Sequence, residues 1–189
     1  MNDNTAAFLK VLDPNDNSTG GGTASAVAGA MAAALVAMVA RLSIGKKNME
    51  KEIYYEDISA EAEKLSIELF SGGREDSEAF EAVSTAYRLP KESDPQKIVR
   101  KDAIQRAMIK AAHVPLANAG KCRRIIELFS NLQGRSNPNT ASDLECAGHL
   151  ARAGLSGCIA NVEINLPYID DQGLVEKLKI QAETLRKSI

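Results

Sequence analysis

Apolar residues recur at spacings of three and four along most of this chain, and no segment alternates apolar and polar residues with period two. The first spacing is typical of helices that bury one face, whereas the second marks strands. The pattern predicts an all-α fold, a single-domain helical bundle of about seven helices that occupies residues 1–189. The expected helices are 4–12, 22–42, 49–70, 76–89, 94–113 with a continuation to 132, 142–166 and 174–185.

Glycine and proline set the expected helix boundaries. Gly72 and Gly73 are predicted to end the helix of residues 49–70, and Asp76 is then predicted to cap the start of the next helix. Pro115 is predicted to break or kink the long helix that begins near residue 94, because proline lacks the amide that a helix interior needs.

Residues 18–40 carry no charge, a run long enough to cross a membrane. Its glycine-rich start and its many alanines, which contribute little to insertion, favour instead a buried central helix, and acidic residues before it disfavour a secretory signal. Small residues follow one face of this helix and bulkier ones another, so two packing partners are expected, and the small stripe predicts a dimer. The small stripe is Ser25, Gly29, Ala33 and Ala37, and the bulkier one is Met31, Leu35 and Met38.

Composition narrows the class of protein further. The 189 residues include 28 alanines and no tryptophan, as expected for helices, and the net charge of −2 argues against a nucleic-acid partner. Three cysteines without CxxC spacing suggest neither a disulfide framework nor a zinc site, which fits a cytoplasmic protein. The two histidines have no patterned metal-ligating companions, so no metal is expected.

A few residues could carry chemistry. Gly20, Gly21 and Gly22 open the central helix, where residues without Cβ let a ligand approach the backbone amides at its positive end. Lys46, Asp76 and Asp143 are the charged candidates, the last following a loop that contains Asn137. Each also has an ordinary structural interpretation, because lysines often follow helix ends and aspartates often cap helix starts. The residues alone therefore leave the substrate open.

Several ordered blocks together are more specific than any single residue. They are STGGGTASAVAGAMAAALVAMVARLSIGKK at 18–47, DSEAF at 76–80, AYRLPKESD at 86–94, VRKDAIQRAMIKAAHVPL at 99–116, the loop at 137–143 and NVEINL at 161–166. The set resembles the cyclodeaminase domain of formiminotransferase-cyclodeaminase and its stand-alone relatives, the bacterial methenyltetrahydrofolate cyclohydrolases. One departure is Thr19, where the family usually has proline.

The resemblance implies an all-helical homodimer that binds a tetrahydrofolate derivative as its substrate and needs no metal. It implies a methenyltetrahydrofolate cyclohydrolase, with a formiminotetrahydrofolate cyclodeaminase as the alternative, since both reactions pass through a tetrahedral carbon and need a group that accepts and returns protons. Asp76 matches the family's D-x-x-A-F position and is expected to be that group, with Lys46 as its charge partner. Asp143 and Asn137 are expected to contact the folate, and Gly20–Gly22 to offer it backbone donors.

Two other function classes remain open at this stage, because a fold does not determine an activity. One is a catalytically silent folate-binding protein, and the other is a structural bundle that binds no small molecule. The retained Asp76, Lys46 and Asp143 speak against the silent protein, and titration with a folate analogue separates it from the structural bundle.

Overall fold

The computed structural model describes residues 3–187, and this part of the chain contains helices and no strand. The all-α prediction is therefore confirmed. The elements are α1 (Asp3–Val11), α2 (Gly21–Ser43), α3 (Glu52–Tyr87), α4 (Asp94–Leu132), the short 3₁₀ helix η1 (Pro138–Thr140), α5 (Ala141–Asn165), the 3₁₀ helix η2 (Leu166–Tyr168) and α6 (Gln172–Lys187).

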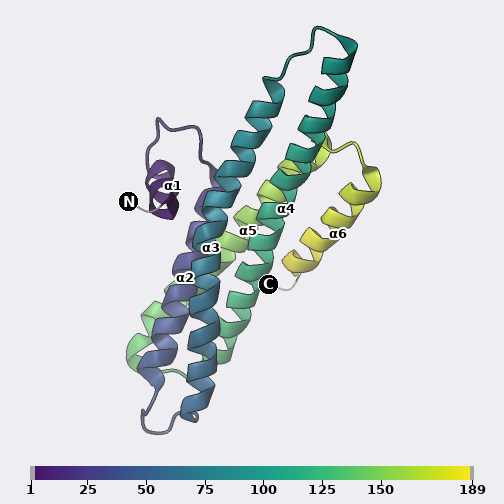
Figure 1. The fold of residues 1–189 in the computed structure, drawn as a ribbon. Helices are drawn as coiled ribbons and strands as arrows, with labels where there is room; N and C mark the ends of the chain where they lie inside the picture. The colour runs from purple at the N-terminus through teal and green to yellow at the C-terminus, as the bar shows by residue number, and fades with distance from the viewer. Residues whose placement is uncertain (1–2, 188–189) are drawn as a thin grey trace.

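Helices α2 to α5 form an elongated bundle in which consecutive helices run in opposite directions (Figure 1). Helix α2 packs on α3 and α5, and α4 packs on the same two helices from the other side. The long α3–α4 hairpin continues past the start of α2, so α2 begins beside the middle of the hairpin (Figure 1). The first turn of α2 is thereby surrounded by the interior stretches of its neighbours.

The central helix α2 is long and apolar enough to span a membrane by length and composition, yet 67% of its most apolar window is buried inside the protein. Alanine and glycine allow this burial, because small side chains let helix axes approach closely. A Cβ atom on Gly29 would lie only 2.6 Å from the sulfur of Cys122 in α4, and one on Gly157 in α5 would lie 2.1 Å from the Ser25 hydroxyl. The burial fits the central helix predicted from the sequence.

Gly72 and Gly73 do not end a helix, and here the sequence-based boundary was wrong. Helix α3 runs without interruption through both residues. A Cβ on Gly72 would lie 2.2 Å from the side-chain oxygen of buried Asn118, whose amide nitrogen donates to the Gly72 carbonyl at 3.3 Å. The glycine pair therefore serves close packing against α4 and α2. Asp76, four residues after Gly72, lies inside α3 and is not the first residue of a separate helix, contrary to the prediction from the sequence.

Pro115 lies within the unbroken helix α4, so the predicted break is also absent. Proline has no amide hydrogen, which leaves the carbonyl of Ala111, four residues earlier, without its helical donor. The side chain of Asn165 in α5 donates to that carbonyl at 3.1 Å. A neighbouring helix thus supplies the hydrogen bond that the proline removes.

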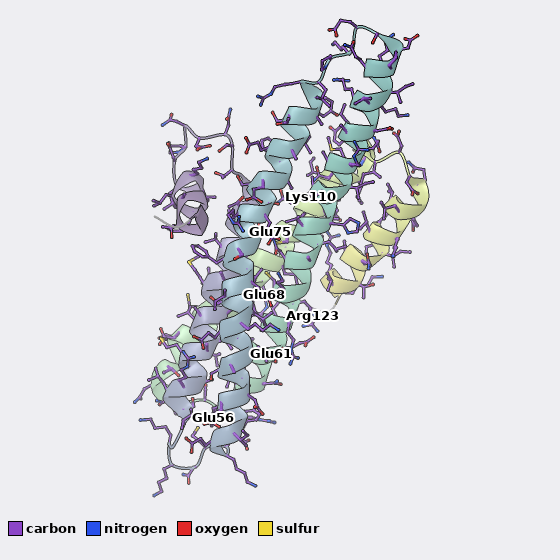
Figure 2. All side chains as sticks on the ribbon, in the orientation of Figure 1. Glu56, Glu61, Glu68, Glu75, Lys110 and Arg123 are labelled. Atoms are coloured by element: carbon purple, nitrogen blue, oxygen red, sulfur yellow. The ribbon has the colours of Figure 1, made fainter. Side chains whose placement is uncertain are left out.

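Charged side chains gather on the outer faces of the long hairpin. Figure 2 shows Glu56, Glu61, Glu68 and Glu75 along α3, with Lys110 and Arg123 on α4. Glu61 accepts hydrogen bonds from Arg124 of α4 at 2.7 and 2.8 Å, which ties the two helices together at the surface. The first half of α3 is thus the one-sided surface helix that its pattern predicted.

Candidate active site

A cleft of about 330 Å³ opens where α2 begins. Its lining comes from the loop before α2, the first turn of α2, the last third of α3, the middle of α4, the end of α5 and η2. The residues are Asn17, Ser18, Thr19, Gly20, Gly21, Gly22, Asp76, Ser77, Phe80, Val83, Met108, Ala111, Asn161, Ile164, Asn165 and Tyr168. The volume falls at the lower end of the range for small-molecule sites. The structure therefore brings Gly20–Gly22 and Asp76 together, as the sequence analysis expected.

The Asp76 carboxylate lies against the amino-terminal turn of α2. The residue preceding that helix, Gly20, has no side chain with which to cap it. Both the amide and the hydroxyl of Thr23 interact with the Asp76 carboxylate, and the hydroxyl oxygen is 3.2 Å from Oδ2. Asp76 thus caps α2 from a neighbouring helix, where the helix dipole and free amides favour a negative charge.

Two opposing effects act on the protonation of Asp76. Burial in the cleft raises its pKa above the ordinary aspartate value, and the hydrogen bonds from Thr23 lower it by a smaller amount. The balance is a raised pKa. A carboxyl group with a raised pKa exchanges protons closer to neutral pH, which is the property required of a general acid and base.

The position of the Asp76 carboxylate requires a glycine at residue 22. A Cβ at Gly22 would lie 2.4 Å from each oxygen of the Asp76 carboxylate. Gly21 faces the other wall, where a Cβ would lie 3.3 Å from the side-chain nitrogen of Asn161. The first turn of α2 is thus enclosed by a carboxylate on one side and an amide on the other.

Two asparagines of α5 contribute polar groups that the sequence analysis did not single out. Asn161 donates to the Gly157 carbonyl at 2.8 Å, and Asn165 donates to Ala111 and to Asn161 at 3.1 and 2.7 Å. Their amide nitrogens are engaged, so their side-chain oxygens remain as acceptors. The signal in the sequence is their spacing of four, which places both on one face of α5.

The remaining wall of the cleft is apolar and partly aromatic. Phe80, Ile164 and Tyr168 line it and are 56, 66 and 54% exposed, respectively. Flat rings bind well to such surfaces, because aromatic stacking adds to the burial of apolar area. One carboxylate, two amides and an apolar wall make a site suited to a flat, nitrogen-rich ligand.

Lys46, Asn137 and Asp143 lie at the opposite end of α2 within the same chain. Lys46 follows the last turn of α2, so about 35 Å of helix separates it from the turn that contacts Asp76. Asn137 binds that same end, where its side chain donates to the Leu42 carbonyl at 3.0 Å. Asp143 is in the first turn of α5, after the same loop. A single chain therefore does not pair Lys46 with Asp76, contrary to expectation.

Comparison with known proteins identifies the relatives of this chain. It is 38% identical to a methenyltetrahydrofolate cyclohydrolase of Methylorubrum extorquens over 97% of its own length and 89% of that protein's length. It is 29% identical to the formimidoyltransferase-cyclodeaminase of Gallus gallus over 88% of this chain, but it spans only 31% of that longer protein. The crystal structure of a formiminotetrahydrofolate cyclodeaminase from Thermotoga maritima superposes with a TM-score of 0.82 at 31% identity, covering 94% of this chain and 85% of that one.

The family model described as formiminotransferase-cyclodeaminase matches residues 4–184, which include every residue of the cleft. The resemblance inferred from the ordered sequence blocks is therefore confirmed. This chain belongs to the formiminotransferase-cyclodeaminase family.

Proposed function

We propose that this protein is a methenyltetrahydrofolate cyclohydrolase, which interconverts 5,10-methenyl- and 10-formyl-tetrahydrofolate. The observation that carries the proposal is the half-buried Asp76 carboxylate, with its raised pKa, beside an apolar and aromatic wall. The methenyl carbon of the substrate lies between two nitrogens that share a positive charge. A single carboxylate in a cleft lined by no lysine or arginine is a fitting counter-charge for that group.

Asp76 would act first as a base and then as an acid. A water molecule adds to the methenyl carbon, forming a C–O bond, while the Asp76 carboxylate takes one of its protons. The protonated Asp76 then gives that proton to N5 as the C–N5 bond breaks. The remaining hydroxyl loses its proton to become the formyl oxygen, so that each turnover releases one proton to solvent.

Formiminotetrahydrofolate cyclodeaminase activity is the second candidate, because the Thermotoga maritima protein, 31% identical to this chain, is a formiminotetrahydrofolate cyclodeaminase. In that reaction N10 attacks the formimino carbon and ammonia leaves, so the same carboxylate would transfer the protons. The higher identity to a cyclohydrolase, over nearly the whole length of both chains, supports placing hydrolysis first.

The expected setting of this activity forms part of the proposal. We infer a homodimer in the cytoplasm that acts on a tetrahydrofolate derivative without a metal ion. The small stripe of α2 packs within the single chain, but the exposed apolar side chains Met31 and Leu42 of the same helix support the dimer. Acid–base chemistry at a single carboxylate supports a mechanism without metal, since the substrate carbon is already electrophilic.

The test is the absorbance of 5,10-methenyl-tetrahydrofolate with purified protein, repeated from 5-formimino-tetrahydrofolate. Loss of the methenyl signal above the uncatalysed rate supports the cyclohydrolase, whereas appearance of that signal with ammonia supports the cyclodeaminase. Asp76→Asn should lower turnover by about a hundredfold or more, a typical contribution of acid–base catalysis. Glu75→Gln, on the exposed face of α3, is the matched control and should keep its activity.

Inactivity with both substrates would reject the enzymatic proposal. Titration with a folate analogue would then separate a silent binding protein from a structural bundle. Normal turnover in Asp76→Asn would leave the family assignment intact and remove Asp76 from the mechanism.

A further inference from the structure

The cleft adjoins a second hollow of about 220 Å³ on the side of α1. Helix α1 packs on α3 and α2 there (Figure 1). Four residues line both hollows, so the two spaces are continuous along α3. These residues are Asn17, Ser18, Ser77 and Phe80. The second hollow, which we call the side pocket, is completed by Lys10, Glu81, Ser84 and Arg88.

Helix α3 links the two hollows through residues on successive turns. Asp76 lies in the cleft, and Phe80, one turn later, lines both hollows. In the side pocket the Arg88 guanidinium donates to the Ser84 hydroxyl at 2.7 Å, which holds it one turn back along the helix. A rise of 1.5 Å per residue sets the level of Ser84 about 12 Å from that of Asp76. The helix therefore presents, in order, a carboxylate, an aromatic ring and a cation.

The side pocket carries the positive charge that the cleft lacks. Lys10 of α1 and Arg88 line it, and neither forms an ion pair with an acidic side chain that the structure describes. Glu81 is the one acidic residue of its described lining. Asp16 also lies close enough to Lys10 for their charges to interact, which offsets part of the lysine charge. Two cations against one acidic residue in the lining leave a site for an anionic group.

The substrate of the proposed reaction carries its chemical groups in the same order as α3. A tetrahydrofolate consists of a reduced pterin, a benzoyl ring and a glutamate, and the methenyl group is a cation that joins the first two. With the methenyl group beside Asp76, the benzoyl ring reaches Phe80, where aromatic rings pack favourably. The benzoyl ring and its amide separate the methenyl carbon from the glutamate carboxylates by a length comparable with two helical turns. Those carboxylates therefore reach the cations of the side pocket.

We propose that the side pocket is the subsite for the glutamate tail, in which Lys10 and Arg88 bind the tail carboxylates while the benzoyl ring packs against Phe80. The proposal rests on the proposed function for its substrate, but it does not require Asp76 to be the acid and base. Lys10 and Arg88 act on binding and not on the chemical step, because they lie away from the reacting carbon. One exposed ion pair strengthens binding by up to about fivefold, so the two together account for roughly ten- to twentyfold.

Removing the glutamate from the substrate tests the subsite directly. The kcat/KM of wild type should be roughly ten- to twentyfold lower for 5,10-methenyl-tetrahydropteroate, which lacks the glutamate, than for 5,10-methenyl-tetrahydrofolate. Lys10→Ala/Arg88→Ala should show the same loss with the folate, through KM, and no loss with the pteroate. Lys177→Ala/Lys179→Ala removes two exposed charges from α6, which lines neither hollow, and should behave as wild type. Full kcat/KM of Lys10→Ala/Arg88→Ala with the folate, or an equal loss with both substrates, would overturn the subsite.

Phe80→Leu tests the place of the benzoyl ring. The variant keeps an apolar side chain but loses the aromatic ring, and KM should rise alike for the folate and the pteroate, because both contain the benzoyl group. Phe80 is 56% exposed, so urea unfolding of the variant should match that of wild type. An unchanged KM for both substrates would remove Phe80 from the subsite.

Binding measured by calorimetry separates the subsite from the proposed reaction. Wild type should bind 5-formyl-tetrahydrofolate more tightly than 5-formyl-tetrahydropteroate, and Lys10→Ala/Arg88→Ala should lose that difference. High salt should also reduce the difference, since exposed charges are screened. The same pattern in a protein that turns over neither substrate would retain the subsite and reject the proposed reaction. Turnover with equal binding of the two analogues would retain the reaction and overturn the subsite, and no binding of either analogue would overturn both.

Discussion

Gly22→Ala is expected to move the Asp76 carboxylate without unfolding the protein. The added Cβ would lie 2.4 Å from both carboxylate oxygens and 2.6 Å from the carboxylate carbon. To restore ordinary contact, the carboxylate must withdraw by about 0.6–1 Å. It can do so by a side-chain rotation, because the groups in contact are at the free end of the aspartate. The substitution therefore acts on the position of Asp76 while leaving its chemistry unchanged.

A displacement of this size is large for an acid–base group. A misplacement of about 1 Å can lower a rate by up to about a hundredfold, so we expect kcat to fall roughly ten- to a hundredfold. The stability should change little. Loss of the contacts between Asp76 and Thr23 costs about 1 kcal/mol, and alanine in place of glycine within a helix returns about 0.5–1 kcal/mol.

The measurement pairs turnover of the methenyl substrate with urea unfolding. Gly120→Ala is the matched control, since no atom lies within 4 Å of its added Cβ and the residue is far from α2 in the sequence. That control should be at least as stable and as active as wild type. Unchanged turnover in a folded Gly22→Ala protein would refute the idea that the first turn of α2 positions Asp76.

Two further predictions concern pH and the proline of α4. Because burial raises the pKa of Asp76, kcat/KM should fall with decreasing pH at a higher pH than an ordinary aspartate would give, and Asp76→Asn should remove that limb. Ionising this buried group costs folding free energy, so the stability of Asp76→Asn relative to wild type should rise from pH 4 to pH 7. Asn165→Ala should destabilise the fold by about 1–3 kcal/mol, since the Ala111 carbonyl loses its donor. In a Pro115→Ala background the new amide supplies that donor and the loss should shrink; an equal loss in urea unfolding of both backgrounds would contradict this interpretation.

The helices could be predicted where the apolar pattern is continuous. The errors in helix boundaries occurred where a glycine or a proline lies at a contact between helices. Glycine at 72 and 73 and proline at 115 are helix breakers by local preference. Both positions lie inside helices, because a side chain of another helix packs on or bonds to the backbone there. Asn118 donates to the carbonyl of Gly72, and Asn165 donates to the carbonyl that Pro115 leaves without a donor. Such partners are distant in sequence, so local reasoning had no access to them.

Only part of the candidate site could be predicted from the sequence. Gly20–Gly22 and Asp76 do meet, and the resemblance pointed to both. The α5 asparagines were missed because two amides spaced by four residues in a helix carry no motif of their own. Lys46 was paired with Asp76 on the resemblance alone, although it follows the far end of the helix predicted at 22–42, and the length of α2 places one chain's copies of these residues far apart.

The cap that Asp76 provides couples the chemistry to local order at the start of α2. The Thr23 amide interacts with the Asp76 carboxylate, which under the proposed mechanism would change charge within each catalytic cycle. Proton uptake weakens that contact and release of the proton restores it. The hydrogen-exchange rate of the amides in the first turn of α2 should therefore depend on the protonation state of Asp76. That rate would measure the charge of the carboxyl group without an activity assay.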